Sequence, residues 1–327
     1  MMNADTRSFQ QAFHERWHQL KNPHVRSIAW LLDAPNLLAS DALQWQGKIA
    51  SLGDSAAFDV HDWLINLEQQ PNDLHAALDI TRFTRLGRYA EKLLAIYFEH
   101  VERLHLHGLQ VHAGKNETIG EFDFLLREQE GLVHWEFATK FYLLCSSNSA
   151  YAQIQQADYF VGPNLADTLG AKMKKIFERQ LLLGTHPAAK ELVNEPLIAA
   201  QALIKGWLFY RREEIINSTA LGISQSHCRG WWCTLAELDE HVGDECAILP
   251  RLSWLAPARL SLEEGMQRHE LRDMLTARFD DDPMPVMVAT FNKHSNELFE
   301  IDRGFVVPND WKERASERLR GLAAPSG

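Results

Sequence analysis

The sequence predicts an α/β fold, because a helical pattern, two strand patterns and a second helical pattern follow one another in the middle of the chain. The helices are expected over residues 85–100 and 165–183, and the strands over 120–126 and 133–141. Hydrophobic residues form 46% of the 327 residues, which is enough apolar mass for a substantial core.

The N-terminal segment, residues 1–78, is predicted to be helical. Apolar side chains between positions 25 and 32 recur at helical spacing, and Pro35 ends that pattern. Pro71 is followed by Asn72 and Asp73, a combination that interrupts regular structure. We expect a boundary near this point, before the α/β core.

The helix expected over residues 85–100 opens the predicted core, which spans 79–185. Its apolar side chains form one stripe at helical spacing: Leu86, Tyr89, Ala90, Leu93, Leu94, Tyr97 and Phe98. Glu91 lies at the edge of this stripe, so a carboxylate is expected beside the buried face of the helix.

The two expected strands form a hairpin whose connection is polar. Successive side chains of a strand point to opposite faces. On one face the pattern places the apolar residues Phe122, Phe124, Leu126, Val133, Trp135, Phe137 and Phe141. On the other it places Glu121, Asp123, His134, Glu136, Ala138 and Lys140. Carboxylates and an ammonium group gathered on one face suit a divalent metal and a water nucleophile.

Two other interpretations of this pattern remain open. Glu136 and Lys140 have the spacing of an ion pair on a helix, although the alternating aromatic and β-branched residues favour a strand. The solvated outer face of an antiparallel hairpin would show the same alternation, and the spacing alone does not separate it from a metal site.

The second expected helix, residues 165–183, carries a stripe of cations. Lys172, Lys175 and Arg179 fall at positions i, i+3 and i+7, a spacing that can follow a row of phosphates. A solvated helix face has the same pattern.

The C-terminal region, 186–327, is predicted to be a tryptophan-rich α+β extension packed on or continuing the core. Strands are expected over residues 203–210, 230–236 and 285–291, a return strand over 298–307, and a closing helix over 311–322.

Charge and cysteine content narrow the class of protein. The formal net charge of -11 argues against indiscriminate coating of nucleic acid, but it leaves room for a local basic channel. The sequence shows no apolar run of membrane-spanning length and no signal peptide. The four cysteines are expected to be free thiols, which suits the reducing cytoplasm.

The segment 120–140 resembles the core of the PD-(D/E)XK nuclease superfamily. The resemblance rests on Gly120-Glu121-Phe122-Asp123-Phe124 followed by His134-Trp135-Glu136. In that superfamily an acidic residue on one strand is followed by Glu-X-Lys on the next, and a glutamate on the preceding helix often completes the site. Over nearly its full length the chain also resembles a family of uncharacterised bacterial proteins, classed as a domain of unknown function and grouped with these nucleases.

The resemblance implies a restriction-endonuclease-like core and a Mg²⁺- or Mn²⁺-dependent nuclease that acts on nucleic acid, with DNA favoured over RNA as the substrate. It implies that Asp123 and Glu136 bind the metal, that Glu91 completes the metal site, and that Lys140 orients the attacking water. Glu121 shares the face of Asp123 and is a substitute ligand.

The sequence departs from the superfamily pattern at one position. Glu-X-Lys would place the lysine at position 138, where this chain has Ala138. Lys140 lies on the same face, about 6.6 Å further along the strand, and its stem is expected to lean back over the small Ala138. The displaced lysine also motivates a second hypothesis, a binding or regulatory protein on a nuclease-like fold that lacks catalysis.

Overall fold

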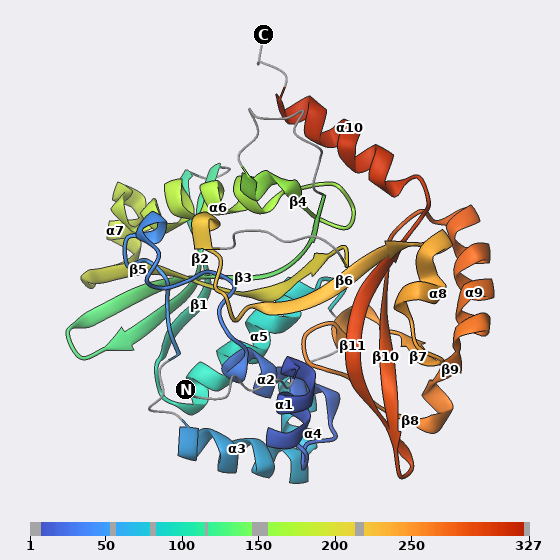
Figure 1. The fold of residues 1–327 in the computed structure, drawn as a ribbon. Coiled ribbons are helices and arrows are strands. Elements are labelled where there is room, and N and C mark those ends of the chain that lie inside the picture. Colours follow the sequence, from blue (N-terminus) through green and yellow to red (C-terminus); the bar gives the residue numbers. More distant parts are fainter. Residues whose placement is uncertain are drawn as a thin grey trace, which may run out of the picture.

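The computed structural model describes residues 8–52, 57–78, 83–114, 117–145, 156–212 and 219–323. These residues form an α/β structure in which helices flank a large mixed sheet of eleven strands (Figure 1). The predicted boundary between residues 78 and 79 adjoins a segment outside the described residues.

The N-terminal segment is helical, as the sequence predicts, with α1 (Phe9–Arg16), α2 (Pro23–Asp33), α3 (Ala57–Gln69) and α4 (Pro71–Leu78). The Asn22 side chain accepts hydrogen bonds from the first amides of α2, and Pro23 suits the first helical turn. The residues of α2 from Val25 to Leu31 are all buried.

Helix α5 (Leu86–His100) confirms the helix predicted over residues 85–100. Its buried stripe covers one face of the sheet, where the Phe98 ring centroid lies 5.2 Å from that of Phe124 and 5.6 Å from that of Trp135. Glu91 is on the buried side of this helix.

The sheet follows the order β1-β2-β3-β5-β6-β11-β10-β7-β9, with β4 beside β3 and β8 beside β11. The strands are β1 (Leu104–Gly114), β2 (Glu117–Glu128), β3 (Gly131–Leu144), β4 (Phe160–Val161), β5 (Leu197–Tyr210), β6 (Cys228–Thr234), β7 (Glu245–Ile248), β8 (Arg259–Ser261), β9 (Met266–Gln267), β10 (Val286–His294) and β11 (Glu297–Val307). Strands β3, β5, β6 and β11 are parallel neighbours, and antiparallel pairs flank them.

The C-terminal strands continue the sheet without interruption. Strand β5 pairs in parallel with β3 from Leu132 to Leu143. The two strands come so close at Gly206 that a Cβ there would lie 1.9 Å from the Lys140 carbonyl oxygen. Glycine at this position therefore lets the centre of the sheet close beside the predicted site.

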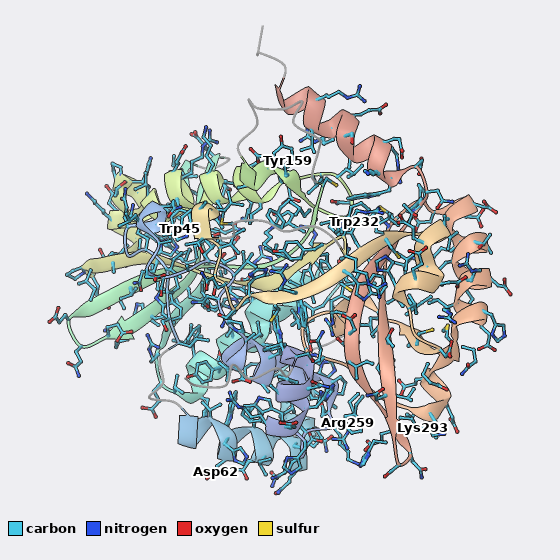
Figure 2. The ribbon with its side chains drawn as sticks, in the orientation of Figure 1. Trp45, Asp62, Tyr159, Trp232, Arg259 and Lys293 are labelled. Carbon is cyan, nitrogen blue, oxygen red and sulfur yellow. The ribbon has the colours of Figure 1, made fainter. Side chains whose placement is uncertain are left out.

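The remaining helices are α6 (Leu169–Glu178), α7 (Pro187–Val193), α8 (Leu238–His241), α9 (Arg268–Asp281) and α10 (Trp311–Ala323). Helices α6 and α7 lie on the face of the sheet opposite α5 (Figure 1). Helix α10 confirms the predicted closing helix. Its Trp311 ring centroid lies 5.3 Å from that of Trp232 on β6, and Trp232 is labelled in Figure 2.

The second core helix is shorter than the predicted 165–183. The Thr168 side chain accepts a hydrogen bond from the Ala171 amide and so starts α6 at Leu169. Arg179 leaves the helical conformation, with φ -131° and ψ -57°, and a 3₁₀ turn, η5 (Gln180–Thr185), follows. The stretch that periodicity predicts as one helix is therefore two separate elements.

Strands β2 and β3 separate halfway along their length. Their pairing runs from the connecting turn to Phe124 and Trp135 and stops there. On the same edge of β3, strand β4 begins to pair only at Leu143. No described strand pairs with this edge between the two, so residues 136–142 of β3 form an open edge.

The alternation of β2 shifts where the strands separate. Phe124 and Leu126 pack on the α5 side, as predicted, but Phe122 packs with Leu125 and Leu132 on the opposite side. The prediction that Phe122 and Phe124 share a face is wrong, because the side chains of β2 do not alternate strictly through Asp123. The shift occurs at Asp123, which the sequence resemblance predicts to be a metal ligand.

No helix in the described part of the chain is long and apolar enough to cross a membrane. All four cysteines are buried, and Cys228, Cys233 and Cys246 are free thiols, as expected.

Candidate active site

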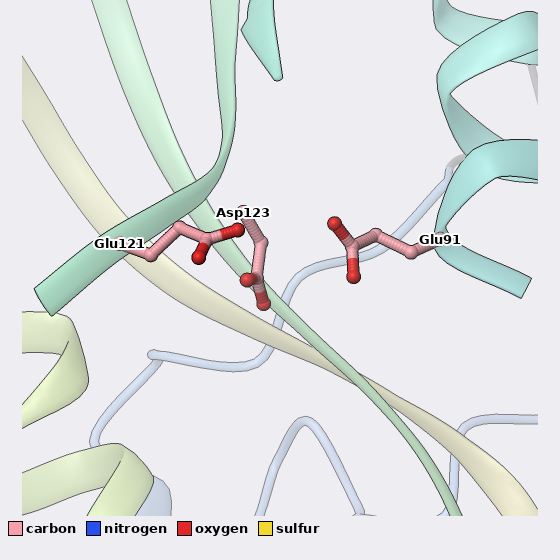
Figure 3. Close-up of side chains that lie close together, drawn as sticks. All are labelled: Glu91, Glu121 and Asp123. Atoms are coloured by element: carbon pink, nitrogen blue, oxygen red, sulfur yellow. The ribbon is translucent and has the colours of Figure 1, made fainter. Parts of the chain in front are cut away.

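Three carboxylates meet where β2 leaves β3. Glu91 reaches them from α5, and Glu121 and Asp123 come from β2 (Figure 3). One oxygen atom from each lies within 4.8 Å of the others. Oxygens at such spacing, drawn from two elements, can coordinate one hard divalent cation.

Asp123 is held at the point of separation. Its Oδ2 accepts a hydrogen bond of 2.9 Å from the Phe137 backbone N–H, which has no partner on β2 because the ladder has ended. Burial is the largest cause that raises the pKa of Asp123, and the neighbouring Glu91 carboxylate raises it further. A cation bound here would relieve both costs.

Glu136 lies beside Asp123 and is almost fully buried, with 2% of its surface exposed. The Gln180 side-chain amide donates a hydrogen bond to its Oε1, and its Oε2 has no hydrogen-bond partner among the described residues. Burial and the charge of Asp123 raise the pKa of Glu136. A buried carboxylate oxygen without a partner is costly, and a metal ion or bound water would satisfy it.

Lys172 of α6 is the cation that approaches Glu136 through Gln180. Its Nζ donates a hydrogen bond of 3.2 Å to the Gln180 Oε1, whose amide group binds Glu136. Burial and the charge of Lys140 lower the pKa of Lys172, whereas Glu136 opposes that change. Lys172 therefore faces the site, unlike Lys175 and Arg179, which are exposed.

Arg88 neutralises part of the acidic cluster. Its Nη1 lies 2.9 Å from Glu121 Oε1 and 3.2 Å from Glu91 Oε1. The hydrogen bond from Arg88 lowers the pKa of Glu121. The Arg88 side chain is itself half exposed, so it can move away from the carboxylates without leaving a buried void.

His107 of β1 fixes the position of Glu91. Its Nε2 lies 2.9 Å from Glu91 Oε1, and its ring stacks on Phe124 with centroids 5.2 Å apart. The contact orients the carboxylate that α5 contributes. His134 is fully buried against the Phe122 ring, and its Nε2 lies 4.0 Å from Glu136 Oε2 without forming a hydrogen bond to described residues.

Lys140 does not lean over Ala138 as expected. Its Nζ lies 3.4 Å from Asp167 Oδ2 and 5.8 Å from the centroid of the Tyr142 ring. Asp167 also accepts a hydrogen bond of 2.9 Å from the Tyr142 hydroxyl. Lys140 is therefore directed along the open edge, toward the loop before α6.

The structure thus gathers two of the three predicted metal ligands, Glu91 and Asp123, and adds Glu121 from the shared face of β2. Glu136 adjoins this cluster. The sequence predicts Lys172 as part of a phosphate-binding stripe on the helix surface, but the structure places it close to Glu136. Sequence reasoning missed three neighbours. Arg88 lies three residues before Glu91, a helical spacing from which their contact could have been predicted. His107 and Gln180 belong to other elements, and no sequence pattern connects them to the site.

The site can be compared with those of known proteins only through the sequence family. No curated protein and no solved structure matches the chain. The profile of one family matches residues 26–307, a range that holds α5, β1 to β11 and every residue of the site. The chain therefore belongs to the family described as domain of unknown function (DUF1853).

Proposed function

We propose that this protein is a metal-dependent nuclease that hydrolyses phosphodiester bonds in nucleic acid. The convergence of Glu91, Glu121 and Asp123 at the open edge of β3 carries this proposal. The buried Glu136 and the inward-facing Lys172 stand beside them. Acidic residues on a helix, on a strand and on the next strand follow the order of the PD-(D/E)XK superfamily, so we assign the core to that fold.

The donor set fits Mg²⁺ or Mn²⁺. All the ligand atoms are carboxylate oxygens, which these hard cations prefer, and no thiol or imidazole is needed. The unsatisfied Oε2 of Glu136 offers a further oxygen. When bound, the cation would polarise the scissile phosphate and lower the pKa of a coordinated water.

The chain's own residues would divide the remaining tasks. Asp123, Glu91 and Glu121 hold the cation at the strand separation, and Glu136 accepts a hydrogen bond from the attacking water. Lys172 supplies a positive charge next to Glu136 and stabilises the charge that develops on the phosphoryl oxygens. Lys140 would contact the nucleic-acid strand at a point further along β3. The buried free thiols of Cys228, Cys233 and Cys246 support a cytoplasmic location for this activity.

The proposal is tested by cleavage of single- and double-stranded DNA and RNA with Mg²⁺ or Mn²⁺. We expect cleavage of DNA in preference to RNA, and its loss in Asp123→Ala and Glu136→Ala. Glu130→Gln is the matched control, because Glu130 is exposed in the β2–β3 turn and its substitution removes the same charge. Cleavage that survives both substitutions in the site would disprove the assignment.

One observation favours a second function, binding of a partner without catalysis. Arg88 already pairs with Glu91 and Glu121, and Lys140 with Asp167, so the charges of these three carboxylates are balanced without a metal. In that case Mg²⁺ would not raise the melting temperature, because a ligand stabilises a protein only when it binds the native state. The two functions therefore differ in a single thermal measurement.

A further inference from the structure

The open edge of β3 leads from the acidic cluster into a second feature, a cavity of about 260 Å³. Its walls come from the start of α5, from residues 139–142 of β3, from the loop 162–167 and from the segment that holds Arg251 and Trp254. The volume is near the lower end of small-ligand sites, roughly 300 Å³, so it suits one phosphate and its sugar.

Three cations line this cavity: Arg85, Lys140 and Arg251. Within the described ranges, Arg85 and Arg251 have no carboxylate at ion-pair distance, and both are exposed. Lys140 shares its charge with Asp167. The cavity therefore has an excess of positive charge in a protein whose net charge is -11.

Neutral groups complete the lining. Leu86 and Gly87 lie in the first turn of α5, where backbone N–H groups have no acceptor within the helix, and both border the cavity. The half-buried Trp254 ring and the Asn164 side chain face the same space. Such donors suit phosphate oxygens, and an aromatic ring suits a sugar or base.

The wall of the cavity is fixed from outside. The Pro163 carbonyl oxygen accepts a hydrogen bond of 2.9 Å from Trp311 Nε1 of α10. At Gly162 a Cβ would lie 2.7 Å from Asp167 Oδ1, so the loop folds tightly around the residue that holds Lys140 and Tyr142.

The cavity and the acidic cluster lie along the same edge of β3. One strand of nucleic acid can span the distance between them. Asp123 binds the amide of Phe137, and the cavity begins at Thr139 and ends at Tyr142. At about 3.3 Å per residue, the two are about 7–17 Å apart along β3.

We propose that this cavity is a phosphate-binding subsite for the nucleic-acid strand whose scissile bond lies at the acidic cluster. The inference rests on the proposed nuclease function and adds the path of the substrate, which runs along the open edge of β3. The phosphate contacts Arg85, Arg251 and Lys140, and its sugar or base contacts Trp254. Either a terminal phosphate or an internal phosphodiester has this chemistry.

The test measures binding without cleavage. Fluorescein-labelled single-stranded DNA with a 5′-phosphate or a 5′-hydroxyl is titrated with the full-length protein in EDTA, at several salt concentrations, by fluorescence anisotropy. The variants are Arg85→Gln and Arg251→Gln. Lys293→Gln removes the same charge from an exposed residue of the β10–β11 hairpin outside the cavity (Figure 2) and serves as the control.

We expect each cavity variant to bind about three- to tenfold more weakly. The slope of log K against log salt should fall by about 0.7 per lost phosphate contact, and Lys293→Gln should match the wild type. A weakening confined to the 5′-phosphorylated strand identifies a terminal phosphate as the ligand, and an equal weakening of both strands identifies an internal one.

Cavity variants that bind like Lys293→Gln, in a protein that still cleaves DNA with Mg²⁺, would overturn the subsite and leave the proposed nuclease intact. A wild-type protein that binds neither strand at low salt would overturn the subsite as well. A protein that binds through the cavity and does not cleave would overturn the nuclease function and retain the subsite.

Discussion

Asp123 accepts the hydrogen bond of the Phe137 backbone N–H, 2.9 Å away, at the place where β2 stops pairing with β3. The carboxylate replaces the carbonyl oxygen that a continued ladder would supply. It therefore stabilises the separation of β2 from β3. The same carboxylate is a candidate metal ligand at the point where the two strands separate. The structure and the proposed chemistry therefore depend on the same side chain.

Asp123→Asn separates these two roles. The asparagine carboxamide oxygen can keep the bond to Phe137, while the loss of charge weakens cation binding. We expect a folded protein whose melting temperature no longer rises with Mg²⁺, whereas the wild type gains about 2.7 kcal/mol at a metal concentration one hundred times Kd. Differential scanning fluorimetry with and without Mg²⁺ measures this, and a full metal response in the variant would contradict it.

The catalytic lysine is predicted to be Lys172 rather than Lys140. Lys172 reaches Glu136 through Gln180, whereas Lys140 is directed toward Asp167. We expect Lys172→Met to lower the single-turnover cleavage rate by about 10²- to 10³-fold with little change in DNA affinity. Lys140→Met should chiefly weaken binding. The reverse pattern would restore Lys140 to the role that the sequence motif implies.

Arg88 is predicted to compete with the metal. It binds Glu121 and Glu91 in the metal-free protein, so Arg88→Gln removes a positive charge from beside the ligands. We expect tighter Mg²⁺ binding by isothermal titration calorimetry. The metal-free protein should lose no more than about 1 kcal/mol of stability, because the side chain is half exposed. Equal Mg²⁺ affinity in variant and wild type would show that Arg88 does not compete.

Much of the framework could be predicted from the sequence because local patterns determine it. Apolar spacing located α5, and alternation located β3, β10 and β11. The same reasoning failed at two places. The local cap at Thr168 starts α6 later than predicted, at Leu169. The alternation of β2 breaks at Asp123, whose side chain binds the Phe137 amide, and Phe122 packs on the opposite face.

The sequence predicts a cluster of carboxylates at the site, but it does not predict all of the residues that surround them. Glu91, Asp123 and Glu136 stand out as polar residues on or beside apolar stripes. Their partners Gln180 and His107 come from elements 44 and 16 residues away, and only the packing of η5 and β1 reveals them. The direction of Lys140 depends on Asp167, which no periodicity connects to it.

Glu136 is predicted to make the metal-free protein less stable as pH rises. Burial and Asp123 raise its pKa above the ordinary value of 4.5, so the folded protein holds this proton more tightly than the unfolded chain. The associated stability is fully present below that ordinary value and is lost as pH rises toward the raised pKa, by at most about 1.4 kcal/mol per pH unit. Glutamine cannot lose a proton and can still accept the bond from Gln180. Glu136→Gln should therefore raise the melting temperature in EDTA, and by more at pH 8 than at pH 5. The exposed Glu130→Gln should show no such trend, and a pH-independent gain in Glu136→Gln would mean that the wild-type carboxylate is not strained by its burial.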